Sequence, residues 1–529
     1  MELRRHALAD LEEVMETTYP KRGMSNGRRL LPRISADFVC YGMIVLLALI
    51  IRCPFFGDPA ADYDEQLYQF IGQRMLEGQL PFVDLWDRKP IGLFLIYAFA
   101  NLVGGPGTLP YQLLAFAAAA GGGILLFHFT RLFTDRVGAT LSALLYVTYL
   151  STFTVRIGQS EVFYIPMLIG MAMLTAKLFQ TTDLRRISRI STAIMVLGGL
   201  TLQIKYTVLP QCAFFGCAIL WRQWRVGVSI HTVLTRAVLY GLIGLAPTLI
   251  VAAVYAYLGH LHEFLYANFF SIFSRGELTG WRRDEARTYI TMLAAPLVLC
   301  AMIGLLRTVR SHIAVQPAYW LVVGWTGSAV ISFAMVGNLY FHYFAPVIPC
   351  LIALAAPALA MSRLGALLAP LSLGFGLLAS DPRATWEFSQ ANRKGFAELT
   401  MAAAPYLGKG KNCLYVYDGP TALYDSTHSC LPTSRIYPDH LSNQMENGAI
   451  GMDQAQEVRR ILRNRPAVLV TASDPVVPQY NPDTAALVNG AVARDYVRVG
   501  AYKYYERKII VNVRRDLLAP GHSQPSTRH

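Results

Sequence analysis

The sequence predicts a polytopic α-helical membrane protein with a small C-terminal α/β soluble domain, and three observations support this class. Of 529 residues, 54% are hydrophobic and only 15% are charged, whereas soluble domains carry about 25% charged residues. Apolar stretches of transmembrane length recur between residues 34 and 380. After Ser380 the composition becomes polar and mixed. We therefore expect about eleven transmembrane helices over 34–380 and a soluble domain over 381–529.

The distribution of basic residues argues against nucleic acid as a partner, although the formal net charge is +13. Lys and Arg fall in short clusters between the apolar stretches, as the positive-inside rule for membrane proteins predicts. A nucleic-acid-binding surface would instead interleave basic and aromatic residues along one face. We expect the basic clusters to mark the cytoplasmic ends of transmembrane helices.

The N-terminal segment 1–33 is predicted to be cytoplasmic. Roughly 35 polar residues precede the first apolar run, too many for the n-region of a secretory signal peptide. Basic residues from Lys21 to Arg33 immediately precede the first predicted span, 34–51, so the N-terminal end of that span should face the cytoplasm. The segment that follows, about 53–110, is then the first outer loop.

The later spans are regular along the chain. We predict them at 111–133, 137–156, 162–180, 190–208, 210–221, 237–258, 290–306, 318–336, 344–361 and 364–380. The Arg-bearing turns between these spans then fall on one side of the membrane, as the positive-inside rule requires. An odd number of spans places the C-terminal domain outside, together with the first outer loop.

Three carboxylates, Asp62, Asp64 and Glu65, open the most charged part of the first outer loop. Ionisable residues close to hydrocarbon are costly and usually functional. Carboxylates this dense repel one another, which raises a proton affinity or requires a cation, and such a group suits a general base. The alternative is structural, because acidic residues also cap helix N-termini. Apolar spacing predicts such a helix over 64–76, lying on the membrane surface.

Arg88 and Lys89 close the same charged stretch. Two cations at a membrane surface suit a phosphate, and a lipid phosphate is the nearest one. The alternative is ordinary positive flanking of the apolar segment that follows. We favour phosphate binding because few positive flanks are expected on the outer side. The segment that follows, 91–105, is short for a crossing, and we interpret it as re-entrant or interfacial.

Further site candidates lie at the outer ends of later spans. Glu161 stands at an outer turn, either as a catalytic carboxylate or as a helix cap. Lys205 lies near the outer end of an apolar span, either as a substrate-binding cation or as a snorkelling side chain. His342 and Tyr343 belong to an aromatic outer turn, which forms either an interfacial belt or a phosphate or sugar contact. Arg275 lies in the remaining outer loop and is placed to cover the site.

The polar tail carries alternating patterns of strand and helix. Strand-like and helix-like runs occur at 413–417, 452–464, 467–472 and 504–513. These runs predict a small α/β domain. The eight cysteines include no CxxC spacing and so no metal-ligand pattern. Cys413 and Cys430 lie in this tail, where they pair if the compartment is oxidising; the alternative is two free thiols.

The first outer loop reads D-x-D-E-x-x-Y, then R-M-L-x-G-x-x-P, then W-D-R-K-P, between Asp62 and Pro90. This pattern resembles the first outer loop of family-39-like membrane glycosyltransferases of the GT-C class. That class includes the protein mannosyltransferases and the bacterial lipid A aminoarabinose transferases. The resemblance extends over about residues 36–360, and Glu161, Lys205 and the aromatic turn at His342 are similarly placed.

The resemblance implies a GT-C-like fold and a multi-pass enzyme of the bacterial inner membrane. Such an enzyme moves a hexose- or pentose-type sugar from a polyprenyl-phosphate donor to an acceptor on the periplasmic face, with inversion. Asp64, with Asp62 or Glu65 beside it, would be the general base for the acceptor. Lys89, with Arg88, would hold the lipid phosphate that leaves.

One position departs from the family pattern. Bacterial relatives often carry an acidic residue directly before the Lys-Pro pair, and this chain has Arg88 there. No cofactor is therefore predicted, and a divalent metal is left open. The sugar, the carrier length and the acceptor, whether glycan, lipid or protein, are not encoded in these motifs.

Two other function classes remain as alternatives. A transporter or flippase of a lipid-linked or small polar substrate would show paired broken helices at the midplane and internal repeats. A non-catalytic scaffold whose tail binds an envelope partner would make the first-loop carboxylates dispensable. The charges gather in one outer loop, and this favours the enzyme.

Overall fold

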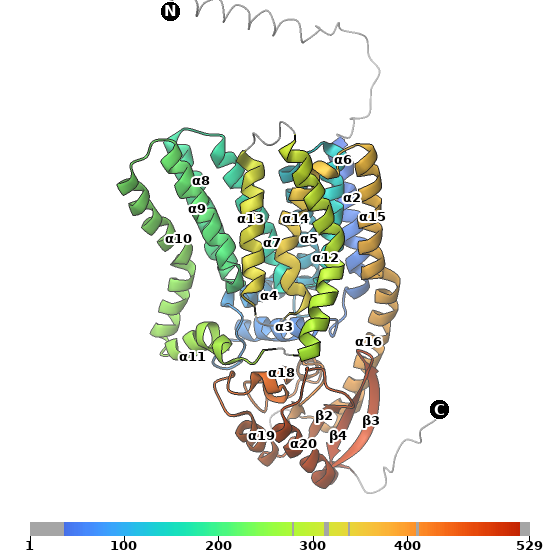
Figure 1. Ribbon diagram of the computed structural model, residues 1–529. Coiled ribbons are helices and arrows are strands. Elements are labelled where there is room, and N and C mark those ends of the chain that lie inside the picture. Colours follow the sequence, from blue (N-terminus) through green and yellow to red (C-terminus); the bar gives the residue numbers. More distant parts are fainter. Residues whose placement is uncertain (1–35, 278–279, 311–316, 337–338, 409–411, 519–529) are drawn as a thin grey trace, which may run out of the picture. The chain divides into compact units, whose positions relative to one another are not determined.

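The computed structural model describes residues 36–277, 280–310, 317–336, 339–408 and 412–518 (Figure 1). The chain divides into two units, residues 1–41 and residues 42–529. The packing and the site described below belong to the second unit. The predicted cytoplasmic segment 1–33 lies outside the described residues.

Helical segments coincide with each of the predicted spans. They are α2 (Ala36–Arg52), α5 (Leu109–Thr130), α6 (Arg136–Thr152), α7 (Ser160–Phe179), α8 (Leu184–Leu202), α9 (Leu209–Arg225), α10 (Ile230–Tyr257), α12 (Gly280–Val309), α13 (Pro317–Ala334), the consecutive segments η6 (Phe341–Val347), α14 (Ile348–Ala355) and η7 (Ala356–Ala358), and α15 (Arg363–Ser380). Seven of the described helical segments are long and apolar enough to cross a membrane by length and composition alone. The polytopic α-helical class is therefore confirmed.

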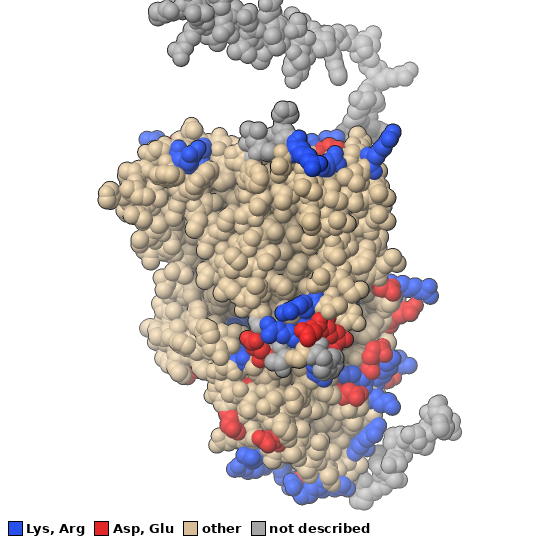
Figure 2. Space-filling view, viewed as in Figure 1, with Lys and Arg blue, Asp and Glu red and all other residues tan. Residues whose placement is uncertain are grey.

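The surface of the bundle agrees with this class. On the face shown in Figure 2, a wide band over the bundle helices carries no Lys, Arg, Asp or Glu. Lys and Arg gather at one end of this band, and charges of both signs gather at the other. A belt without charge is what contact with hydrocarbon requires, because charged side chains are costly there.

Helix α3 (Tyr63–Leu76) forms where the surface helix was predicted. Figure 1 shows it running across the ends of the bundle helices rather than along them. Leu67, Phe70 and Ile71 are buried, as the predicted apolar stripe requires. The helix stops before Gly78, which has a φ of 89°, a conformation that glycine adopts without steric cost.

Helix α4 (Ile91–Gly104) packs directly against α3. A glycine allows this close approach, since a Cβ on Gly72 would lie 2.7 Å from the Cβ of Tyr97. At 1.5 Å per residue, the 14 residues of α4 extend about 21 Å. That is shorter than the hydrocarbon core of about 30 Å. The pair α3–α4 thus forms a platform at one end of the bundle.

The remaining helical segments lie in loops between the bundle helices or in the C-terminal domain. They are η1 (Cys53–Phe55), η2 (Tyr206–Val208), α11 (Leu261–Leu265), the π-helical turn η3 (Tyr266–Phe270), η4 (Ser271–Ser274), α16 (Pro382–Ala403), η8 (Ala404–Tyr406), α17 (Leu423–Ser426), α18 (Pro438–Ser442), η9 (Gln444–Glu446), α19 (Gln454–Arg463), α20 (Pro482–Asp495) and η10 (Arg515–Leu517). Helix α16 follows α15 directly and packs against the sheet of the C-terminal domain (Figure 1).

The described part of the C-terminal domain contains a four-stranded mixed sheet. Its strands are β1 (Leu414–Val416), β2 (Val468–Ala472), β3 (Tyr496–Tyr504) and β4 (Arg507–Arg514), in the order β1-β2-β4-β3. The first two pair in parallel, and β4 pairs antiparallel with both neighbours. Together with α19 and α20, this sheet confirms the predicted small α/β domain.

One predicted strand differs from the structure. The run 504–513 was expected to be continuous, but β3 ends at Tyr504 and β4 begins at Arg507. Between them Tyr505 and Glu506 have φ values of 50° and 60°. Two central residues with positive φ form the tight turn whose twist matches antiparallel strands. Strand β3 itself was missed, because its charged and glycine residues weaken the strand pattern.

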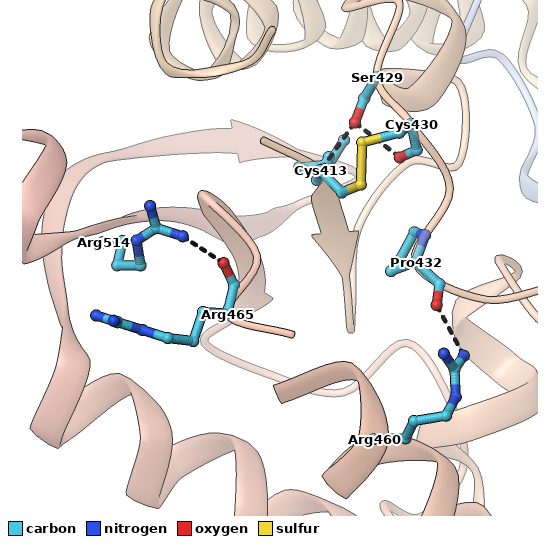
Figure 3. Close-up of a disulfide and its surroundings, with 8 residues drawn as sticks. Cys413, Ser429, Cys430, Pro432, Arg460, Arg465 and Arg514 are labelled. Carbon is cyan, nitrogen blue, oxygen red and sulfur yellow. Dashed lines mark hydrogen bonds between the residues drawn. A yellow bond between two sulfur atoms is a disulfide. The ribbon is translucent and has the colours of Figure 1, made fainter. Parts of the chain in front are cut away.

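The two cysteines of the C-terminal domain form a disulfide (Figure 3). Cys413 and Cys430 are bonded, with their Cα atoms 4.9 Å apart. Beside the disulfide, the Ser429 hydroxyl accepts from the backbone N–H of Leu414 (2.7 Å) and donates to the carbonyl of Cys430 (2.9 Å). Of the two alternatives, a disulfide or two free thiols, the structure therefore contains the disulfide.

Candidate active site

A cavity of about 1260 Å³ lies between the charged loop that runs from Asp62 to Pro90 and the C-terminal domain. Its walls come from the first loop, the turns near residues 205–210 and 340–343, the segment 267–277, and two loops of the C-terminal domain. Eight of the ten predicted site residues line it: Asp62, Asp64, Arg88, Lys89, Lys205, Arg275, His342 and Tyr343. Glu65 and Glu161 are outside this lining. The fold therefore collects residues that are up to 281 positions apart (62 to 343) around one space.

Asp62 and Asp64 stand at the N-terminus of α3. Asp62 is the N-cap, because its Oδ1 accepts a hydrogen bond of 3.0 Å from the backbone N–H of Asp64. The side-chain amide of Gln159 donates to Asp62 Oδ1 (3.1 Å) and to Asp64 Oδ2 (3.4 Å). Asp62 therefore has the capping role that was the structural alternative, and it also lines the cavity.

The surroundings separate the proton affinities of these two carboxyl groups. Burial, together with the charge of Asp64, raises the pKa of Asp62 to about 7. Burial alone would also raise the pKa of Asp64, but the charges of Lys89 and His342 and two hydrogen bonds hold that pKa at about 2. At neutral pH, Asp64 is therefore ionised, and Asp62 is close to its titration point.

One of those hydrogen bonds comes from the C-terminal domain. The hydroxyl of Tyr437, at the start of α18, donates to Asp64 Oδ1 at 2.8 Å. Sequence reasoning missed this residue, which lies 373 positions away from Asp64. No spacing pattern links the two, since only the tertiary fold brings them together.

Lys89 contributes an ammonium group that is bonded to a neutral partner. Its Nζ donates to the hydroxyl of Tyr68 at 2.6 Å, and its backbone N–H donates to Oδ1 of Asp87 at 2.8 Å. Burial acts to lower the pKa of Lys89, but the charges of Asp64 and Asp87 act in the opposite direction and raise it. Lys89 thus stays protonated at the cavity wall.

Arg88 and Arg275 are held by a carboxylate of the C-terminal domain. Arg88 donates to both oxygens of Glu446, with Nη1–Oε1 at 3.0 Å and Nη2–Oε2 at 2.6 Å. Arg275 Nε lies 2.6 Å from Glu446 Oε1, and its Nη2 lies 3.7 Å from Oδ2 of Asp439. Glu446 is fully buried. It was not predicted from the sequence.

The two carboxylates outside the cavity lining have local partners. Glu65 is buried and accepts a hydrogen bond of 2.6 Å from the backbone N–H of Gly158, and burial raises its pKa well above the usual value. Glu161 is buried and forms an ion pair with Lys205. Lys205 is itself buried, so it does not snorkel towards water.

The aromatic turn of η6 forms another part of the cavity wall. The rings of Tyr340 and His342 are stacked, 5.8 Å apart and 10° from parallel. Tyr343 lies edge-on to His342 at 4.5 Å, and its ring centre is 4.3 Å from the ammonium of Lys205. The predicted residues of this turn are therefore in contact with one another and with the Lys205–Glu161 pair.

The titratable side chains at the cavity determine what chemistry it can perform. Within the described ranges, no group of three or more His, Cys, Asp or Glu side chains is arranged to hold a metal ion. The arrangement offers acid–base and electrostatic chemistry instead: an ionised carboxylate, a second carboxyl group near its titration point, and a protonated amine.

Comparisons with known proteins identify the fold. No protein-family model matches the chain, and no curated protein matches it in sequence. The structure is similar to ArnT from Cupriavidus metallidurans, a lipid A aminoarabinose transferase, in the apo state, with a TM-score of 0.60 and 13% identity over 92% of this chain and 100% of that one. ArnT bound to undecaprenyl phosphate gives a TM-score of 0.59 over the same shares, also at 13% identity. An oligosaccharyltransferase from Archaeoglobus fulgidus gives 0.47 at 12% identity, over 92% of this chain and 75% of that one, too low to add to the argument. The chain is a multi-pass membrane protein with the GT-C fold that ArnT has.

Proposed function

We propose that the protein is a glycosyltransferase that moves a sugar from a polyprenyl-phosphate donor to a hydroxyl acceptor. One observation carries the proposal: an ionised carboxylate, Asp64, and a protonated amine, Lys89, line the same cavity at one end of an apolar bundle. The first is suited to take a proton, and the second is suited to hold a phosphate.

The chemistry is a single displacement at the anomeric carbon. The acceptor oxygen forms a bond to that carbon while its proton passes to a carboxylate oxygen of Asp64. The bond between the anomeric carbon and the phosphate oxygen breaks, and its electron pair leaves with the lipid phosphate. Positive charge at Lys89 stabilises the negative charge that develops there. One displacement of this kind inverts the anomeric configuration.

The other predicted cations at the cavity already have carboxylate partners. Arg88 and Arg275 are already paired with Glu446, and Lys205 is paired with Glu161. We therefore assign binding of the lipid phosphate to Lys89 and a structural role in the cavity wall to the paired cations. ArnT, whose fold is similar, has been solved with undecaprenyl phosphate bound, and this supports a lipid-phosphate ligand here.

We further propose that the cavity faces the periplasm of a bacterial inner membrane. The disulfide Cys413–Cys430 supports this side, because disulfides persist in oxidising compartments. The C-terminal domain that carries it also lines the cavity. In this proposal, 1–33 is cytoplasmic, 34–380 is the catalytic membrane domain and 381–529 is the periplasmic domain.

Transfer of a labelled sugar from a polyprenyl-phosphate donor to membrane or envelope material tests the proposal. We expect Asp64→Asn and Lys89→Ala each to lower transfer by about 10²-fold or more. Glu77→Gln is the matched control, because Glu77 is an exposed carboxylate at the other end of α3. A flippase would move the labelled lipid without forming a new glycosidic bond. Full transfer in both site variants would contradict the assignment.

A further inference from the structure

Glu446 is shared by two arginines that line the cavity. It belongs to η9 of the C-terminal domain and is fully buried. Its two oxygens are shared by Arg88 and Arg275, and both arginines line the cavity. A guanidinium pair of this kind matches the geometry of a phosphate. The carboxylate of Glu446 therefore takes the contacts that a phosphate group would make.

The pairing is complete at physiological pH. Burial acts to raise the pKa of Glu446, but the charges of Arg88 and Arg275 hold it at about 2. The side chains of Arg88 and Arg275 are only 15% and 9% exposed, and the Arg88 guanidinium also lies 5.1 Å from the ring centre of Trp86. Arg88 donates to Glu446 through both Nη groups. Arg275 lies 2.6 Å from Glu446 and 3.7 Å from Asp439.

The neighbouring wall of the cavity presents a carboxylate rather than a cation. Asp439 lines the cavity with 19% of its side chain exposed, 3.7 Å from Arg275. The hydroxyl of Tyr437 donates a hydrogen bond to Asp64, and the hydroxyl of Tyr63 accepts a hydrogen bond of 2.7 Å from Arg507. These two tyrosines and the segment Pro475–Pro478 complete this wall, which offers apolar rings and carboxylate acceptors.

We propose that Glu446 determines the charge class of the acceptor: together with Asp439, Glu446 balances the two positive charges of Arg88 and Arg275. The arginine pair then excludes phosphorylated acceptors, and the wall binds an uncharged hydroxyl compound, such as a neutral saccharide. This inference rests on the proposed function for the identity of the reacting group. The same choice follows from Asp64. A phosphate monoester is largely dianionic at neutral pH and can attack without a base, whereas an alcohol needs one.

Binding of ³²P-labelled inorganic phosphate, measured by equilibrium dialysis on the full chain in detergent, tests the exclusion without requiring transfer. The assay uses the Lys89→Ala background, so that the proposed donor site does not contribute. We expect Lys89→Ala alone to bind phosphate weakly. Adding Glu446→Gln should raise the affinity at least about tenfold, the equivalent of one hydrogen bond to a charged group. Adding Arg275→Gln to that double variant should remove the gain.

Two results would overturn the inference. In the first, Lys89→Ala binds phosphate tightly with Glu446 intact and loses it on Arg275→Gln, which would mean that the arginine pair is open. In the second, the folded Lys89→Ala/Glu446→Gln protein gains no affinity. If Glu446→Gln does not fold, the Arg275→Gln comparison with Glu446 intact still decides between an open and a closed arginine pair. A negative result in the phosphate-binding assay does not affect the sugar-transfer assay, so each proposal can be contradicted without the other.

Discussion

Two lysines line the same cavity, and their surroundings differ. Lys205 is buried and paired with the buried carboxylate of Glu161. Lys89 is partly exposed and donates to the neutral hydroxyl of Tyr68. The charge of Lys205 is neutralised in its ion pair. The ammonium of Lys89 is stabilised by the charges of Asp64 and Asp87, but its hydrogen-bond partner is a neutral hydroxyl. The residue type alone therefore does not indicate the role of a lysine. The charge of the group to which its ammonium is bonded does.

The carboxylates of the site repeat this contrast. Glu161 and Glu446 face cations and are fully buried. Asp64 accepts from two neutral groups, Tyr437 and Gln159, and lines the cavity. We therefore assign a structural role to the charges that are held in ion pairs. Charges whose hydrogen-bond partners are neutral are the candidates for a chemical role.

The largest effect that this contrast predicts is on stability. Lys205→Ala leaves Glu161 buried without a counter-charge, which costs about 3–5 kcal/mol of unfolding free energy. Lys89→Ala should cost clearly less, because Lys89 has no buried carboxylate as its hydrogen-bond partner. Denaturation in detergent, followed for both variants, measures the difference. Equal destabilisation by the two variants would break the contrast.

A smaller effect is expected at Tyr437. Tyr437→Phe removes the hydroxyl that donates a hydrogen bond to Asp64. It leaves Lys89, the proposed phosphate-binding residue, unchanged. We expect kcat to fall about tenfold, or about 1.4 kcal/mol, while KM for the lipid donor stays nearly constant. Tyr266→Phe is the control, since its hydroxyl donates to the carbonyl of Gly448 away from the carboxylates. An unchanged kcat in Tyr437→Phe would show that the hydrogen bond is only structural.

The smallest effect concerns pH. Because the pKa of Asp62 is raised to about 7, its proton is retained below that pH and lost above it. The second negative charge then increases the basicity of Asp64. Transfer should therefore rise as the pH increases through about 7, and Asp62→Asn should flatten this rise. A rise of the same size in the variant would assign the titration to another group.

The fold class was predictable because transmembrane helices depend on local composition. Each predicted span coincides with helical segments, since the membrane environment imposes a long apolar run whatever the neighbouring helices are. The charges of the first loop were visible for the same reason, as Asp64 and Lys89 stand out beside apolar segments.

The partners that set those charges were not predictable. Tyr437 and Glu446 lie 373 and 358 positions from the residues that they bond, and no periodic pattern spans such distances. Glu65 shows a second limit. It follows Asp64 directly, but one step along a helix turns the side chain by about 100°, so Glu65 is buried against Gly158. The density of charge indicated a region that lines the cavity, but it did not show which of the three carboxylates faces it.

Binding and transfer measured on the same two variants test the central claim most directly. A polyprenyl-phosphate sugar is titrated against Asp64→Asn and Lys89→Ala, and labelled transfer is followed in parallel. We expect Asp64→Asn to bind the donor as tightly as wild type but to transfer at least about 10²-fold more slowly. We expect Lys89→Ala to lose donor binding. Loss of donor binding in Asp64→Asn, with binding and transfer intact in Lys89→Ala, would contradict the central claim.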